Sequence, residues 1–278
     1  MAGNSRSPAH RRRKALGQHF LVQPAAIRRI LDILEISAHD RILEIGPGLG
    51  ALTMGLADRC EALLAVEVDP GLAERLGTRL SGKRSVRLIT GDILRLDPAA
   101  LLRTLRGATR NRRIRVVGNL PYRISTAVLQ KYLEPIGKVS DYHFMFQKEV
   151  AERLAALPRT PAYGYISVLA QIHCQVKILM RVSPGSFRPP PLVDSALVGL
   201  YPRPRRPWRT TVREERFRSF LRIAFANRRK TLANNLRHGA GWKPEKIGTF
   251  LEKQGLSPVV RAEELSPAAF LRLFSGLK

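Results

Sequence analysis

Short apolar segments alternate with amphipathic helical segments along the first half of this 278-residue chain, and this alternation constrains the fold more than any other feature. Four apolar runs are typical of buried strands, at 41–45, 62–68, 85–90 and 114–118. The segments between them have helical periodicity, at 52–59, 71–80 and 98–105. Strands and helices that alternate in this way form a parallel sheet covered by helices, whose ligands bind beyond the carboxyl ends of the strands.

The mixed pattern continues to residue 202 and then changes. A helix is predicted over 24–34, and further strands and helices are predicted at 125–132, 142–146, 149–157, 164–173 and 197–201. Three prolines between Tyr201 and Trp208 exclude regular structure there. Beyond them, the chain predicts helices at 214–227, 228–237, 244–254 and 267–277. We therefore expect an α/β domain over 1–202 and a small all-α domain over 203–278.

The charge of the chain indicates a polyanionic partner. Lys and Arg number 48 against 22 Asp and Glu, which gives a formal net charge of +26, while 44% of the residues are apolar. Such a composition folds into a globule, and most of the cations are Arg, whose planar donor group matches phosphate oxygens. Charge alone does not distinguish a ribosomal protein, an enzyme acting on RNA or a binder of anionic membranes.

Location and metal content are also constrained by composition. No apolar run is long enough to span a bilayer, and Cys60 and Cys174 stand far apart without a neighbouring cysteine. We expect a soluble cytoplasmic protein with no membrane association and no metal site. The Arg-rich start of the chain resembles a transit peptide in composition, but the first motif begins at Leu16, which favours a polar arm.

The sharpest local motif is a glycine-rich loop that follows the first predicted strand. The segment Glu44-Ile45-Gly46-Pro47-Gly48-Leu49-Gly50 has three glycines spaced by two, where a strand turns into a helix. Such glycines let the backbone turn tightly and approach a ligand closely. The spacing departs from the dinucleotide pattern, and no Gly-Lys-Ser/Thr follows, which excludes a Walker A loop.

Two acids follow the next two predicted strands. Glu67 ends the second strand about 20 residues after Gly46, where an acid would bind the two hydroxyls of a ribose. Asp92 follows the third strand and can accept a hydrogen bond from an adenine amino group. Taken singly, both fit equally well as solvated acids at strand ends. Together with the loop, and without a lysine that holds phosphates, they favour the cofactor S-adenosylmethionine.

The motif Asn119-Leu120-Pro121-Tyr122 stands at the end of the fourth predicted strand. An exocyclic adenine nitrogen is a poor nucleophile because its lone pair is delocalised into the ring. The Asn119 side-chain carbonyl and the Leu120 main-chain carbonyl, held by Pro121, can accept its two hydrogens and so localise that lone pair. Tyr122 can stack on the base. We therefore predict methyl transfer by positioning, with these four residues as the catalytic motif.

The chain resembles the rRNA adenine N6,N6-dimethyltransferase family along nearly its whole length. The segments that carry the resemblance are 16–21, 43–53, 66–69, 91–94, 117–126, 147–153, 163–164, 187–191, 193–196 and 227–232. The resemblance implies a Rossmann-like methyltransferase domain. It also implies transfer of four methyl groups to the N6 atoms of two adjacent adenosines in the 3′-terminal hairpin loop of small-subunit (16S) rRNA, within a 30S assembly intermediate, by a monomer.

The resemblance also assigns site residues. Matching positions imply cofactor contacts at His19, Leu21, Gly46, Glu67, Asp92 and Asn119. Phe187 would cover the other face of the target base, opposite Tyr122, although an aromatic residue before prolines equally fits a packing role. The chain departs from the common family pattern at His19, where Asn is frequent, at Gln23, where Asp is frequent, and at Leu192, where Lys is frequent.

Basic residues far outnumber acids between 203 and 237. We expect the helical segment there to bind RNA phosphates through Arg218, Arg222, Arg228, Arg229 and Lys230, and a solubilising charged face is the alternative. The basic arm Arg11-Arg12-Arg13-Lys14 can lie on RNA or over the cofactor.

Two other functions remain open. One is a large-subunit (23S) rRNA adenine methyltransferase of the antibiotic-resistance type. The segments 191–196 and 227–232 favour the small-subunit type over this alternative. The other is a non-catalytic RNA-binding assembly factor on the same fold, against which the intact motif at 119–122 argues.

Overall fold

The computed structural model describes residues 18–106, 113–133, 139–204, 211–241 and 243–277. The chain divides into two compact units. The first contains residues 1–148 and 178–200, and the second contains residues 149–177 and 201–278. The acidic and aromatic residues of the predicted reaction site lie in the first unit, and the predicted RNA-binding cations lie in the second.

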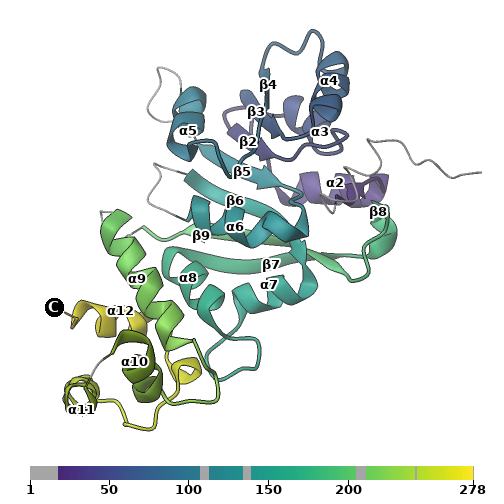
Figure 1. Cartoon of the computed structure of the whole chain (residues 1–278). Coiled ribbons are helices and arrows are strands. Elements are labelled where there is room, and N and C mark those ends of the chain that lie inside the picture. Colours follow the sequence, from purple (N-terminus) through teal and green to yellow (C-terminus); the bar gives the residue numbers. More distant parts are fainter. Residues whose placement is uncertain (1–17, 107–112, 134–138, 205–210, 242, 278) are drawn as a thin grey trace, which may run out of the picture. The chain divides into compact units, whose positions relative to one another are not determined.

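A seven-stranded sheet organises the first unit, with the strand order β4-β3-β2-β5-β6-β9-β7 (Figure 1). The strands are β2 (Arg41–Ile45), β3 (Ala62–Glu67), β4 (Val86–Thr90), β5 (Ile114–Gly118), β6 (Val139–Gln147), β7 (Cys174–Val182) and β9 (Ser195–Pro202). The pairs from β4 to β6 are parallel, and β9 is antiparallel to β6. Strand β7 crosses the division between the units, because residues 174–177 belong to the second unit.

The helices of the first unit are α2 (Pro24–Ile33), α3 (Thr53–Ala57), α4 (Pro70–Arg79), α5 (Pro98–Arg106) and α6 (Tyr122–Tyr132). Helices α2 and α3 bury apolar side chains against the sheet, in a core that includes Ile30, Leu34, Ile42, Leu56 and Val117. The strand order confirms the predicted parallel α/β sheet. The chain builds the sheet outward in opposite directions from β2 and from β5, and ligands of such sheets bind at the point between these two strands.

Three strands were not predicted from the sequence: β7 in the large sheet, and two short strands outside it. β1 (Phe20–Leu21) pairs antiparallel with β8 (Phe187–Arg188), so that Leu21 faces Phe187 across the ladder. Just before β8, the side chain of Ser186 donates to Gln23 Oε1 over 2.7 Å. Gln23 therefore helps to fix the segment that carries His19 and Phe20.

Buried charges hold the opposite, amino-terminal end of the sheet. Arg115 on β5 donates from Nε to Asp141 on β6 over 2.8 Å, and from Nη1 to Asp40 over 3.1 Å. All three side chains are buried. Arg113 lies near the same two carboxylates at 3.5–3.9 Å but is largely exposed. The network ties β5 and β6 to the residue that precedes β2.

The second unit is helical. Its helices are α7 (Lys148–Ala155), of which Lys148 belongs to the first unit, α8 (Tyr165–His173), α9 (Thr211–Ala224), α10 (Leu232–Ala240), α11 (Pro244–Lys253) and α12 (Pro267–Ser275). One apolar core joins Tyr163, Val168 and Ile172 to Phe217 and Phe270. The proposed domain boundary at 202/203 assigned residues 149–177 to the large domain. In the structure they belong with the C-terminal helices, because their apolar side chains share this core.

The helices predicted at 214–227 and 228–237 are shifted, because residues 225–231 form a turn between α9 and α10. Asn235 donates to the main-chain carbonyls of Ala224 and Asn227, and Thr231 caps α10 by accepting from the Asn234 amide. These polar side chains satisfy the free carbonyl and amide groups at the two helix ends.

Candidate active site

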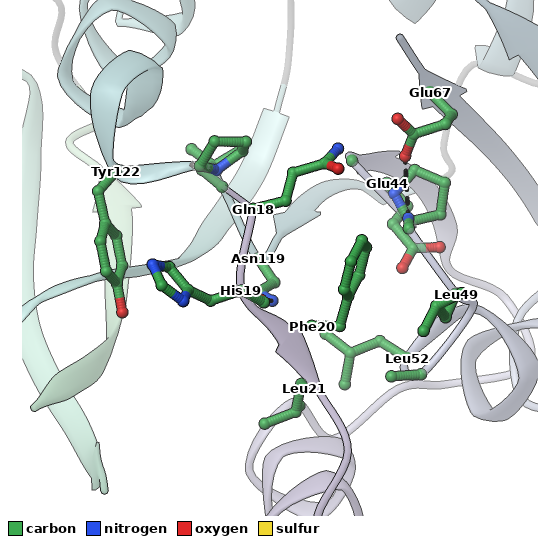
Figure 2. A pocket seen from close by; sticks show the side chains of 16 residues that line it. Gln18, His19, Phe20, Leu21, Glu44, Leu49, Leu52, Glu67, Asn119 and Tyr122 are labelled. Carbon is green, nitrogen blue, oxygen red and sulfur yellow. Dashed lines mark hydrogen bonds between the residues drawn. The ribbon is translucent and has the colours of Figure 1, made fainter. Parts of the chain in front are cut away.

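A cavity lies beyond the carboxyl ends of β2 and β5 and encloses about 600 Å³ of space including its open mouth (Figure 2). The residues that line it come from the N-terminal strand β1 and the two residues before it, from the glycine loop and the two residues after it, from the end of β3, and from the motif after β5: Gln18, His19, Phe20, Leu21, Glu44, Gly46, Pro47, Gly48, Leu49, Ala51, Leu52, Glu67, Asn119, Leu120, Pro121 and Tyr122. Five of the six predicted cofactor contacts and the four residues of the predicted reaction motif therefore meet in one place.

The glycine loop has a conformation that only glycine adopts easily. Gly46, Gly48 and Gly50 have φ values of +69°, +56° and +82°. A Cβ atom on Gly50 would lie 2.6 Å from the Leu76 side chain, and one on Gly48 would lie 3.0 Å from the ring of Phe20. The sequence therefore needs glycine both for the turn and for the close approach of neighbouring groups.

Glu67 ends β3 and is buried next to this loop. Its Oε2 accepts from the Gly48 amide and its Oε1 accepts from the Asp69 amide, each over 3.0 Å. Burial raises the pKa of the Glu67 carboxyl, and the two amide hydrogen bonds oppose that shift. The carboxylate joins the loop to the start of α4 and presents its remaining lone pairs toward the cavity.

Asp92 lies outside the first cavity. It lines a second cavity of about 640 Å³ with Val66, Val68, Gly91 and Ile93, residues that follow or end β3 and β4. Its Oδ1 accepts from the Leu94 amide over 2.9 Å. Four residues line both cavities: Gln18, Gly46, Glu67 and Pro121. The two cavities therefore adjoin, and the second one is mainly apolar.

The side-chain amide of Asn119 has a defined orientation. Its Nδ2 donates to the main-chain carbonyl of His19 over 3.1 Å. The oxygen of the Asn119 side-chain amide therefore faces away from the N-terminal segment that contains His19. Leu120 is buried, and Pro121 precedes the first residue of α6, so the motif forms a packed junction between β5 and α6.

Tyr122 opens α6 and is held at two points. Its hydroxyl forms a hydrogen bond with the hydroxyl of Ser195, and burial raises the pKa of the phenol. The imidazole of His19 lies beside its ring, with centroids 5.4 Å apart and planes tilted by 31°. The Nδ1 atom of His19 lies 2.7 Å from the Pro189 carbonyl, which can only accept, so Nδ1 carries the proton. His19 thus covers one side of Tyr122.

Among the cavity residues to which the sequence assigned no role, three have polar or aromatic side chains: Gln18, Phe20 and Glu44. Gln18 and Phe20 point into the cavity from the N-terminal strand (Figure 2). Glu44 is 2% exposed, and its Oε2 has no hydrogen-bond partner among the described residues. Burial raises the pKa of the Glu44 carboxyl to about 8, an interaction with Thr53 opposes the shift, and the charge of Glu67 adds to it. The sequence could have indicated Glu44, because it is the first residue of the glycine-rich motif.

Phe187 does not lie in the cavity. Its side chain is 0% exposed and packs in the core of the first unit with Leu21. The reason is the β1–β8 ladder, in which Phe187 faces Leu21 and turns inward. The structure therefore does not support the predicted stacking of Phe187 on a target base.

The five predicted RNA-binding cations have different environments in the second unit. Arg218 is buried and donates to Glu214 over 3.0 Å, and His173 contacts the same carboxylate. Arg218 is thus a structural residue, which corrects its predicted role. Arg228 lies in the turn and pairs with Glu263 at 2.9 Å.

The other three cations are exposed, as Arg228 is, but they form no ion pair with an acidic side chain among the described contacts. Arg222 lies over the ring of Tyr165, 5.9 Å from its centroid. The turn between α9 and α10 also carries Arg229 and Lys230, whose side chains are exposed. The surface of the second unit therefore offers Arg222, Arg229 and Lys230 to a ligand.

Within the described ranges, no group of three or more His, Cys, Asp or Glu side chains could hold a metal ion. A search of the same residues finds no helix that is long and apolar enough to cross a membrane.

Comparison with known proteins gives a consistent picture. The profile of the ribosomal RNA adenine dimethylase family matches residues 9–278. Ribosomal RNA small subunit methyltransferase A of Pseudomonas fluorescens is 43% identical over 269 residues, which cover 96% of this chain and 94% of that protein. The match therefore spans both units.

Two solved structures share the fold. A dimethyladenosine transferase from Plasmodium falciparum superposes with a TM-score of 0.71 at 23% identity, covering 92% of this chain and 96% of that one. The 23S rRNA methyltransferase ErmE superposes with a TM-score of 0.66 at 26% identity, covering 93% of this chain and 99% of that one. These structures confirm the predicted Rossmann-like fold class.

Proposed function

The chain belongs to the ribosomal RNA adenine dimethylase family, and from this premise we propose that it methylates two adjacent adenosines of 16S rRNA. It is an rRNA adenine dimethyltransferase. We propose that each N6 atom in the 3′-terminal hairpin loop receives two methyl groups, during assembly of the 30S subunit in the cytoplasm. The observation that carries this proposal is the meeting of the Asn119 motif, the glycine loop and Glu67 in one cavity.

The two cavities fit S-adenosylmethionine as the methyl donor. The glycine loop brings main-chain groups to the cavity wall, and Glu67 keeps lone pairs for two ribose hydroxyls. The mainly apolar second cavity suits an adenine ring, with Asp92 at its edge. The unpartnered Oε2 of Glu44 suits the ammonium group at the other end of the cofactor. When bound, the cofactor supplies an electrophilic methyl group on a sulfonium sulfur.

The reaction motif is suited to activate an adenine N6 atom. The oxygen of Asn119 and the carbonyl of Leu120 accept the two N6 hydrogens, which localises the nitrogen lone pair. Because His19 fixes the amide orientation, the Asn119 oxygen needs no rearrangement to accept. The target base stacks on the side of the Tyr122 ring that His19 leaves open. Rate enhancement then comes from positioning and polarisation.

Exposed cations of the second unit supply phosphate contacts. Arg222, Arg229 and Lys230 are proposed to bind the rRNA backbone, and the net charge of +26 favours this partner over uncharged surfaces. We propose that the enzyme acts as a monomer without a metal ion.

The main alternative is methylation of 23S rRNA. ErmE shares the fold, but its identity of 26% is well below the 43% of the small-subunit enzyme of P. fluorescens. This difference favours 16S rRNA.

Incubation of the protein with methyl-labelled S-adenosylmethionine and purified ribosomal particles tests the proposal. Immature 30S particles that lack the modification should incorporate label, and 50S particles should not. Label confined to 50S particles would establish the large-subunit function. Absence of label from both, together with tight RNA binding, would establish a non-catalytic assembly factor.

A further inference from the structure

The loop between β8 and β9, residues 189–194, is anchored at both ends on the ring pair of the active site. At its start, the Pro189 carbonyl accepts from the imidazole of His19 over 2.7 Å. At its end, the first residue of β9, Ser195, hydrogen-bonds the hydroxyl of Tyr122. The two rings are themselves in contact, 5.4 Å between centroids. The loop therefore connects the hydrogen-bond partners of His19 and Tyr122, two residues that line the cavity.

The loop is also stiff. Residues 189–191 are all proline, whose rings fix φ, and Pro191 is buried. Near the other end, the Asp194 carbonyl accepts from the Lys148 amide over 2.9 Å. A loop held in this way presents its middle residues in one place rather than over a range of conformations.

The middle of this loop carries an apolar side chain in solvent. Leu192 is fully exposed, and its neighbour Val193 is 45% exposed. Leu192 contributes nothing to the core, unlike Phe187 a few residues earlier, which is completely buried. Leu192 is three positions before Ser195, so its Cα lies within about 11 Å of the Ser195 Cα atom.

We propose that Leu192 is a substrate-recognition residue that packs against an RNA base next to the target adenosine. A base that leaves its stack exposes the faces of its neighbours, and proteins commonly cover such faces with apolar side chains. Leu192 offers that contact on the loop that ends at Ser195, the hydrogen-bond partner of Tyr122, on which the target base is proposed to stack. This inference rests on the proposed function, because it takes an unstacked adenosine at Tyr122 as given.

Binding of a hairpin RNA that carries the two adjacent loop adenosines tests the contact separately from methyl transfer. The dissociation constant is measured over a series of salt concentrations for the wild-type protein, for Leu192→Ser and for Leu157→Ser. The last variant is the matched control, because Leu157 is also an exposed leucine, at 67%, outside this loop.

Leu192→Ser should raise the dissociation constant about tenfold, which corresponds to loss of a buried leucine contact. A plot of the logarithm of the RNA dissociation constant against the logarithm of the salt concentration should have the same slope as for the wild type, because no phosphate contact is lost. Affinity for S-adenosylmethionine and the melting temperature should not change. Leu157→Ser should bind like the wild type, and Leu192→Met should retain affinity within about twofold.

Wild-type affinity in Leu192→Ser, or an equal loss in Leu157→Ser, would overturn the proposal. So would a Leu192→Lys variant that binds more tightly and with a steeper salt slope, since a phosphate would then lie at this position. Failure of the proposed function gives a different result, because the wild type would then leave 30S particles unmethylated. The dissociation constants of the wild type and the Leu192 variants for hairpin RNA would still show whether Leu192 contacts the RNA.

Discussion

The side-chain amide of Asn119 donates to the main-chain carbonyl of His19, 100 residues earlier in the chain, over 3.1 Å. This hydrogen bond decides which atom of the amide faces the substrate. It also makes the N-terminal strand part of the reaction site, since that strand is held by its pairing with β8. The proposed recognition of an amino group by Asn119 therefore depends on contacts distant in sequence.

Replacement of Asn119 by alanine should abolish methyl transfer while largely preserving RNA binding. The variant removes the proposed acceptor for one N6 hydrogen, and loss of one such polar contact in an active site costs about 100-fold or more in kcat. Single-turnover transfer to 30S particles measures the effect, alongside the dissociation constant for RNA. Asn234→Ala, at an exposed position on α10, is the control. Equal losses of binding and turnover would contradict the assigned role.

Glu44→Gln should change how stability depends on pH in the cofactor-free protein. The Glu44 carboxyl is buried and its pKa is raised from 4.5 to about 8. The unfolded chain loses this proton above pH 4.5, whereas the folded protein keeps it until about pH 8, so this group's contribution to stability is present below pH 4.5 and is lost as the pH rises to 8. The shift corresponds to about 4–5 kcal/mol.

Urea unfolding of the wild type and of Glu44→Gln at pH 5 and pH 8 measures this effect. As the pH rises from 5 to 8, the unfolding free energy of the wild type should fall by a few kcal/mol relative to that of Glu44→Gln. A difference that stays constant with pH would show that Glu44 is ionised in the folded protein.

Arg115→Met should strongly destabilise the first unit. The variant leaves the Asp40 and Asp141 carboxylates buried without their main partner, and loss of one member of a buried ion pair costs about 3–5 kcal/mol. Arg113→Met is the matched control, because Arg113 approaches the same carboxylates from an exposed position. It should cost less than about 1 kcal/mol. Denaturant unfolding followed by circular dichroism compares them, and equal costs would contradict this account.

Double replacement of Arg229 and Lys230 by alanine should weaken RNA binding and lower the salt slope by about 1–2, since each lost phosphate contact removes about 0.7–0.9 from it. Melting temperature should not change, because both side chains are exposed. Arg218→Met should instead affect stability and leave the phosphate contacts unchanged, because Arg218 is buried against Glu214. It should lower the melting temperature, and at a temperature where it is folded it should keep the salt slope.

The cofactor half of the site could be predicted because it depends on local rules. Gly46, Glu67 and Asn119 each follow or end a strand, and neighbouring parallel strands bring their carboxyl ends together. The motif spacing therefore indicated the correct place on the sheet.

Residues whose roles depend on distant pairing could not be predicted in this way. Phe187 looked available for stacking because nothing in its neighbourhood shows that β8 pairs with β1 and turns it inward. Arg218 looked like an RNA contact, although the Glu214 one helical turn earlier was a signal for an ion pair. The His19 contact with Tyr122 joins segments about 100 residues apart.

The most direct test of the central claim is to map the modified nucleotides. Immature 30S particles are incubated with the protein and S-adenosylmethionine, and nuclease fragments of the 16S rRNA are analysed by mass spectrometry. We expect N6,N6-dimethyladenosine at two adjacent positions of the 3′-terminal hairpin loop and at no other site. Modification at another position, or only a single methyl group per adenosine after the reaction has gone to completion, would contradict it.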